Sequence, residues 1–157
     1  MMKDAENVRV VVRVRPLTER EECSGDSELV SCQGDRSVQV IEQHGRGRPV
    51  TGTAFQFNQC FGVECGQEQL FERCGVLSLL DHVLDGYSAT VFAYGPTGSG
   101  KTYTITGRPD SILKYGSGDA SDGIVIRSVE ALFDKIPGQQ HERREHAETP
   151  ESVGSEI

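Results

Sequence analysis

The chain has 157 residues, of which 36% are hydrophobic, and its formal net charge is −8 at pH 7. This length predicts one domain, and the composition is typical of a globular protein rather than a disordered one. The acidic balance argues against non-specific binding to nucleic acid or lipid, because a basic patch carries the affinity in both cases. No apolar stretch is long enough to span a bilayer, and the N-terminus lacks the apolar core of a signal peptide.

The cysteines form an odd, scattered set that contains no Cys-x-x-Cys pair. This pattern favours reduced thiols in a cytosolic protein, mostly serving as packing residues, over disulfides or a metal site. The five cysteines are Cys23, Cys32, Cys60, Cys65 and Cys74.

Short strands are predicted in the first third of the chain. Valines recur at every second position over residues 8–14, which is the pattern of a strand with one apolar face, and Pro16 ends it. Residues 18–21 fit a capping box that opens a short helical turn, although an exposed charged loop is an equal alternative. Weaker patterns predict an edge strand over residues 37–41 and a strand over residues 53–57.

Two helices and a buried strand are predicted further along the chain. Apolar residues at helical spacing predict one helix over residues 67–85, with Gly75 as a small internal cost and Gly86 at its C-terminal cap. Residues 87–94 are rich in β-branched and aromatic side chains and predict a short buried strand. A second helix is predicted over residues 124–136. Its apolar face would consist of Val125, Val129, Leu132, Phe133 and Ile136.

Two polar segments flank the second helix. Residues 109–123 predict a polar loop, and residues 137–157 differ from the rest in having few aliphatic side chains. That composition predicts a disordered tail.

Residues 95–102 fit the phosphate-loop pattern G-x-x-x-x-G-K-[ST] at every fixed position. Glycines let successive backbone N–H groups turn inward towards phosphate oxygens, and a helical start at residues 101–106 adds its positive N-terminal end. Lys101 is placed to reach the β- and γ-phosphates, and the Thr102 hydroxyl is placed to bind Mg²⁺. The predicted phosphate-binding residues are Gly95, Pro96, Thr97, Gly98, Ser99, Gly100, Lys101 and Thr102.

Two further points qualify this loop. Pro96 removes one N–H group, but it precedes the glycines that wrap the phosphate, so we expect its effect to be tolerable. The alternative is a Gly-Ser linker that contains Lys-Thr by chance. The predicted strand before the loop and the helical start after it disfavour that alternative.

The residues around the loop resemble the kinesin motor domain. An Arg-x-Arg-Pro motif lies in a first strand, and the other motifs follow in the family's order over residues 7–136. The matching segments are residues 11–17, residues 55–62 followed by Gln67 and Phe71, and residues 86–95, 103–107 and 123–127.

This resemblance implies an α/β fold of the P-loop NTPase class, a three-layer α/β/α kinesin motor type with a central, mostly parallel sheet. Residues 7–136 would be its N-terminal part, and residues 137–157 the tail. In the complete protein it implies ATP hydrolysis coupled to movement along microtubules, with ATP or ADP and Mg²⁺ as cofactors and a cytoplasmic, cytoskeletal location. Neither nucleic acid nor membrane insertion is expected. Cargo, direction, oligomeric state and subclass stay open, with a kinesin-12-like motor as one alternative.

The same resemblance assigns residues to the adenine side of the nucleotide site. Arg13, Arg15 and Pro16 would line it, and Tyr103 would stack on or near the base. The residues alone allow simpler interpretations: the arginines as the solvated face of an edge strand, Pro16 as a strand stop, and Tyr103 as a surface aromatic.

The sequence also departs from the family pattern. Pro96 stands in place of the usual Gln, and Ile126 in place of the usual Pro. No switch I segment like Ser-Ser-Arg-Ser-His and no switch II segment like Asp-x-Ala-Gly occurs in the 157 residues. In the family these segments sense the γ-phosphate and position the attacking water, which phosphoryl transfer requires.

We therefore expect the 157-residue chain alone to bind nucleotide without hydrolysing it. We also expect it to be incompletely folded alone, because the strand before the phosphate loop would lack neighbouring strands. Such a chain would be a splice product, a truncated gene model or a fragment. The remaining alternative is a product that neither folds nor binds ATP. A different P-loop class, such as a GTPase, is disfavoured by the Arg-x-Arg-Pro strand.

Overall fold

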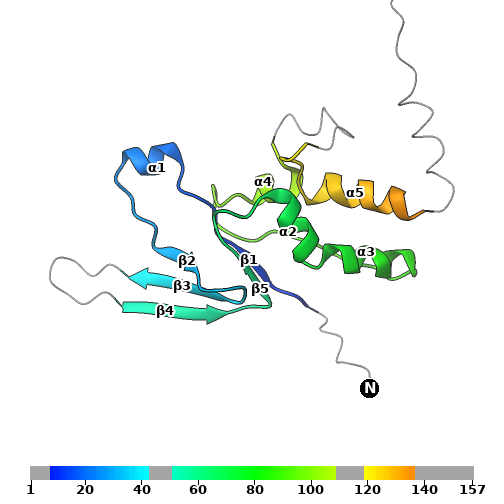
Figure 1. Ribbon diagram of the computed structural model, residues 1–157, viewed down its shortest axis with the longest axis horizontal. Helices are drawn as coiled ribbons and strands as arrows, with labels where there is room; N and C mark the ends of the chain where they lie inside the picture. The colour runs from blue at the N-terminus through cyan, green and yellow to red at the C-terminus, as the bar shows by residue number, and fades with distance from the viewer. Residues whose placement is uncertain (1–7, 43–50, 109–118, 137–157) are drawn as a thin grey trace, which may run out of the picture.

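The computed structural model describes residues 8–42, 51–108 and 119–136 (Figure 1). A two-stranded parallel sheet and a three-stranded antiparallel sheet are combined with five helices in these residues. In Figure 1 the antiparallel sheet extends to one side of the parallel pair, and helices α2 to α5 gather on the other side. In chain order the elements are β1 (Val11–Arg13), α1 (Glu19–Cys23), β2 (Val30–Cys32), β3 (Ser37–Glu42), β4 (Thr51–Gln56), β5 (Gln59–Phe61), α2 (Gln67–Arg73), α3 (Val76–Leu84), α4 (Lys101–Thr106) and α5 (Ile124–Lys135).

The parallel pair is formed by β1 and β5, in a register that places Val12 opposite Cys60. The predicted first strand is present but shorter than residues 8–14, because β5 offers only three residues for pairing. Val8 and Val10, before the paired part, are exposed. This pair sets the direction of Arg13, the last residue of β1.

The antiparallel sheet has the order β2-β3-β4. Strands β3 and β4 confirm the strands predicted over residues 37–41 and 53–57, although β4 ends at Gln56 and does not include Phe57. Strands β2 and β5 were not predicted, because three-residue strands are too short for an alternating pattern to be recognised.

The capping box predicted at residues 18–21 is confirmed at the start of α1. The Thr18 hydroxyl accepts a hydrogen bond from the Glu21 N–H, and the Glu21 carboxylate accepts one from the Thr18 N–H at 2.8 Å. The alternative of an exposed loop is therefore wrong for this segment.

The helix predicted over residues 67–85 is two helices in the structure. Gly75 separates α2 from α3 with a φ of 95°, a left-handed conformation that glycine adopts without the steric cost of a Cβ atom. The expectation that Gly75 is only a small cost inside one helix is thus wrong. Both helices still turn apolar residues into one core with β5 and α5, and its buried members are Phe61, Cys65, Leu70, Phe71, Cys74, Val76 and Leu80.

The strand predicted over residues 87–94 is absent, which corrects the sequence interpretation. None of the described strands pairs with this segment, and every one of its residues is exposed. Phe92 and Tyr94 have 79% and 96% of their surface exposed. The apolar, β-branched composition favours a buried strand, but a buried strand needs neighbours on both edges, and the described residues provide none.

Helix α5 confirms the second predicted helix, ending at Lys135 rather than at residue 136. Its buried face differs from the prediction. Ile126 is its one buried residue, whereas Val125, Phe133 and Ile136 are exposed. The helix lies against α3 and α4 at once, so its contact face turns towards Ile124, Ala131 and Leu132.

The remaining predicted segments lie largely outside the described residues. These are residues 109–118 of the predicted polar loop and the whole predicted tail, residues 137–157. Among the helices that the structure describes, none has the length and apolar character needed to cross a membrane.

Candidate functional site

The phosphate loop connects the exposed segment 87–94 to α4. Gly98 and Gly100 have φ values of 80° and 92°, in the left-handed region where other residues are strained. Gly100 is also the residue that precedes the first turn of α4. Glycine is therefore favoured at both positions; the phosphate-loop pattern requires it at Gly100, whereas Gly98 stands at a variable position of that pattern.

Lys101 lies across this loop. Its Nζ donates hydrogen bonds to the carbonyl oxygens of Gly95 at 2.9 Å and of Pro96 at 2.7 Å. The next residue, Thr102, is exposed at the start of α4. The ammonium group is thus held at the loop, where it can exchange carbonyl partners for phosphate oxygens.

Arg15 attaches the N-terminal part of the chain to the loop. Its Nε donates to the Gly98 carbonyl at 2.8 Å, and its two terminal nitrogens each donate to the Glu21 carboxylate at 2.7 Å. Hydrogen bonds from Arg15, and then from the backbone and side chain of Thr18, lower the pKa of Glu21 to about 2. Arg15 also donates to the carbonyl oxygen of the exposed Pro16. The capped turn of α1 therefore orients the arginine that contacts the loop.

Arg13 and Tyr103, both predicted for the adenine side, lie next to each other. The Arg13 guanidinium carbon is 5.3 Å from the centre of the Tyr103 ring. Arg13 donates to the Thr104 hydroxyl at 3.1 Å and to the Cys65 carbonyl at 3.0 Å, and burial lowers its pKa. The interpretation of Arg13 as a solvated strand residue is wrong, because its guanidinium is bound inside the fold.

Gln67 is the residue that sequence reasoning missed. Only 3% of its surface is exposed, and its Oε1 accepts a hydrogen bond from Arg13 at 2.6 Å. Its Nε2 donates to the Tyr103 carbonyl at 2.5 Å and to the Ser121 carbonyl at 3.4 Å. The family resemblance includes Gln67 at the start of this helix, but neither the resemblance nor the local pattern assigned the residue a role in the site.

A short backbone contact joins the end of α4 to the residues just before α5. Gly107 and Asp122 form an isolated antiparallel bridge, and a Cβ atom on Gly123 would lie 2.5 Å from the Gly107 nitrogen. Asp122 is 1% exposed, and neither oxygen of its carboxyl group has a hydrogen-bond partner. Arg127 donates to the Asp122 carbonyl at 2.9 Å. A Cβ atom at Gly107 or at Gly123 would clash with the facing backbone, so only glycine fits at these two positions.

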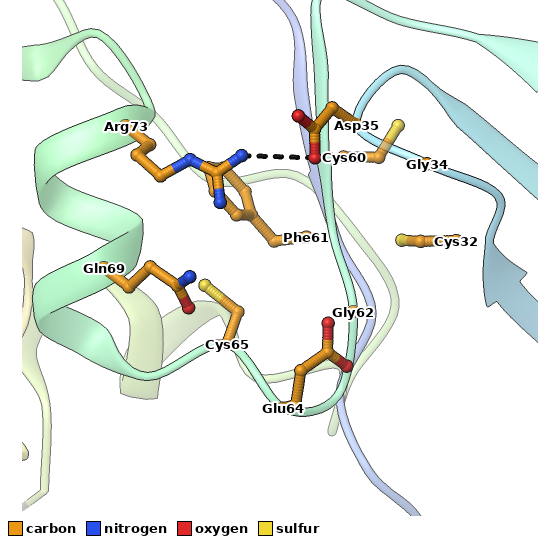
Figure 2. Close-up of a pocket in the computed structure, with 10 residues that line it drawn as sticks. All are labelled: Cys32, Gly34, Asp35, Cys60, Phe61, Gly62, Glu64, Cys65, Gln69 and Arg73. Atoms are coloured by element: carbon orange, nitrogen blue, oxygen red, sulfur yellow. Dashed lines mark ion pairs between the residues drawn. The ribbon is translucent and has the colours of Figure 1, made fainter.

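A separate cavity of about 170 Å³ lies between β5, α2 and the β2–β3 turn (Figure 2). Cys32, Cys60 and Cys65 line it, and burial raises the pKa of all three thiols. At its edge Arg73 pairs with Asp35 at 3.2 Å. No residue of the phosphate loop lines this cavity, so it is distinct from the predicted site. All five cysteines are free thiols.

The side chains near the phosphate loop can be compared with the ligands that a metal ion requires. Within the described ranges, no three His, Cys, Asp or Glu side chains come together in a way that could hold a metal ion. A hydroxyl such as that of Thr102 is a hard oxygen ligand, and Mg²⁺ is commonly held by few protein oxygens together with substrate phosphates and water. The residues therefore fit a phosphate-bound Mg²⁺ rather than a protein cage.

Comparisons with known proteins agree with one another. The family model described as the kinesin motor domain matches residues 13–152, past the predicted boundary at residue 136, which stays a prediction. The chain is 41% identical over 135 residues to the kinesin-like protein Klp61F of Drosophila melanogaster, covering 85% of this chain and 12% of that protein. It is 33% identical over 138 residues to KIN-5C of Arabidopsis thaliana, covering 87% of this chain and 14% of that protein.

One solved structure gives the corresponding result in three dimensions. It is titled "Structure of a fast kinesin: Implications for ATPase mechanism and interactions with microtubules", and it matches with a TM-score of 0.68 at 32% identity. The match covers 82% of this chain and 33% of that chain. The chain thus spans a third of that structure and 12–14% of the curated relatives named above.

Proposed function

The chain belongs to the kinesin motor domain family, and on that premise we propose that it supplies the ATP-binding part of a microtubule motor ATPase. Its fold is the α/β P-loop NTPase fold of that family. The observation that carries the proposal is the phosphate loop, in which Gly98 and Gly100 are left-handed and the Lys101 ammonium lies on the loop carbonyls, an arrangement that supports binding of an anion. Microtubules are the proposed partner of the complete protein, in the cytoplasm and on the cytoskeleton.

Each part of the site has a proposed task. Lys101 gives up its carbonyl partners and binds the β- and γ-phosphates, while the loop N–H groups bind the remaining phosphate oxygens. Arg15 holds the loop in place through the Gly98 carbonyl. Mg²⁺, when bound, neutralises phosphate charge, and Thr102 is its proposed protein ligand. Arg13, Arg15, Pro16 and Tyr103 are the proposed adenine-side residues.

Thermal unfolding of the 157-residue chain with and without Mg²⁺–ADP tests the nucleotide site. At 100 times its Kd the ligand should add about 2.7 kcal/mol to the free energy of unfolding. Lys101→Ala should lose this stabilisation because the phosphates lose their cation. Lys135→Ala, which changes an exposed lysine paired with Asp81, should keep it. A transition that ignores nucleotide in the unaltered chain would contradict the proposal.

We further propose that residues 1–157 bind nucleotide without hydrolysing it, since no switch I or switch II segment occurs in them. Microtubule-stimulated phosphate release by this chain, lost in Lys101→Ala, would contradict that. The exposure of residues 87–94 favours a second candidate, a chain that does not fold alone. Absence of any cooperative transition in the thermal experiment would support this second candidate.

The names of the similar proteins indicate a kinesin subclass. Proteins named KIN-5 from Arabidopsis thaliana and Oryza sativa match at 32–38% identity. We therefore favour a KIN-5-like subclass over the kinesin-12-like alternative. Motility direction of the complete protein on polarity-marked microtubules would compare it with those relatives.

A further inference from the structure

Gln67 joins four parts of the fold through one side-chain amide. It lies at the start of α2, yet its hydrogen-bond partners belong to β1, to α4 and to the residues just before α5. The contacts run to Arg13, to the Tyr103 carbonyl and to the Ser121 carbonyl. Because the side chain is buried, water cannot replace these partners at low cost.

The amide contacts two of the predicted adenine-side residues, Arg13 and Tyr103. Its oxygen binds the Arg13 guanidinium at 2.6 Å, and its nitrogen binds the Tyr103 backbone at 2.5 Å. A hydroxyl contact from Thr104 and a carbonyl contact from Cys65 complete the shell around Arg13. The cation–π contact between Arg13 and the Tyr103 ring therefore depends on where Gln67 places its two ends.

The chemistry of the amide suits this task. A primary amide offers an acceptor to a cation and two donors to carbonyl groups, and Gln67 uses both kinds of atom here. A carboxylate would keep the acceptor but would oppose the carbonyls, and an aliphatic side chain would lose all of these bonds. No residue of the phosphate loop contacts Gln67 among the hydrogen bonds described.

We propose that Gln67 is a positioning residue for the base side of the nucleotide site, fixing Arg13 against Tyr103 without touching the phosphates. This inference rests on the proposed function. The proposed nucleotide site then has two parts. The phosphate loop with Lys101 binds the phosphates, and the group formed by Gln67, Arg13 and Tyr103 shapes the contact with the base.

The test compares two ligands on the 157-residue chain, Mg²⁺–ADP and Mg²⁺–pyrophosphate, because only the first carries a base. Gln67→Ala should weaken ADP binding about tenfold, which corresponds to about 1.4 kcal/mol, and should change pyrophosphate binding less than about twofold. Gln69→Ala, an exposed glutamine two positions along the same helix, should leave both affinities unchanged. Gln67→Glu keeps the acceptor for Arg13 and should fall between the unaltered chain and Gln67→Ala.

The outcomes separate the inference from the function on which it rests. Equal weakening of both ligands in Gln67→Ala, or no weakening of ADP, overturns the positioning role while the nucleotide site stands. Loss of cooperative unfolding in both Gln67 variants also overturns it, since the residue is then required for folding. Failure of the unaltered chain to bind either ligand overturns the proposed function and this inference with it.

Discussion

At the scale of single residues, the clearest anomaly is Asp122. Its carboxyl group is buried where the Gly107–Asp122 bridge joins the end of α4 to the start of α5, and neither carboxyl oxygen has a hydrogen-bond partner. An unsatisfied buried polar group costs free energy that the unfolded chain does not bear, because water solvates the group there. The residue therefore opposes folding in the structure as described.

Asp122→Ala should raise the free energy of unfolding by about 1–3 kcal/mol, because it removes that penalty. The measurement is urea unfolding followed by circular dichroism. Asp119→Ala is the matched control: Asp119 accepts hydrogen bonds from the backbone and hydroxyl of Ser121, both at 2.7 Å, so its removal should destabilise. A loss of stability in both variants would show that Asp122 has a stabilising role.

Residues differ in how far the sequence could predict them. Lys101 and the glycines of the loop follow a fixed spacing, because the backbone and the phosphate impose it locally. The proximity of Arg13 and Tyr103 was implied by the family resemblance alone. Gln67 belongs to the family resemblance, but its role in the site could not be predicted, because its hydrogen-bond partners are far away in sequence.

At the scale of elements, Gly75 decides how the chain passes from α2 to α3. Its left-handed φ changes the direction of the backbone between two helices whose apolar residues share one core. A Cβ atom there would lie 3.0 Å from Nε of Arg9. The break thus depends on a glycine that, in sequence, reads as a mild helix defect.

Gly75→Ala should lower the free energy of unfolding by about 1–2 kcal/mol, because alanine is strained in the left-handed region. Thermal unfolding by calorimetry would measure it. Ser78→Ala, an exposed position inside α3, should change stability by only a few tenths of a kcal/mol. If Gly75→Ala were as stable as the original chain, α2 and α3 would be able to form one continuous helix.

Strands and helices differ in predictability for a physical reason. Helices α4 and α5 and the capped turn α1 are determined by neighbouring residues; α4 and α5 were predicted, and the capped turn was one of two equal alternatives. Residues 87–94 have the composition of a buried strand, but pairing depends on distant partners, and no described strand supplies one. The three-residue strands β2 and β5 were missed because their pairing partners, not their patterns, define them.

At the scale of the whole molecule, the described sheets and helices leave the apolar segment 87–94 uncovered. Val91, Phe92 and Tyr94 are exposed next to the phosphate loop. Exposed apolar strand-forming segments with unpaired backbone groups favour association between chains. The 157-residue chain should therefore associate at high concentration.

Phe92→Ser should shift this association to higher concentration, measured by sedimentation velocity over a dilution series. The reason is the removal of the large exposed aromatic side chain from the segment. Val63→Ser removes an exposed apolar residue outside the segment and should have little effect. Equal behaviour of the two variants would show that association does not proceed through residues 87–94.

The way β1 meets β5 has a consequence for the order of folding. Val10 and Asn58, 48 positions apart, are joined by two hydrogen bonds, and the β2–β3–β4 sheet lies entirely within the chain between them. The β2–β3 turn also contacts β5, since the Cys60 N–H donates a hydrogen bond to the Asp35 carbonyl at 2.7 Å. Each halving of the chain length to be closed saves only about 0.6 kcal/mol of entropy, yet a preformed meander removes most of that length at once. We therefore expect that formation of the antiparallel sheet first would shorten the free chain that must close to bring β1 to β5.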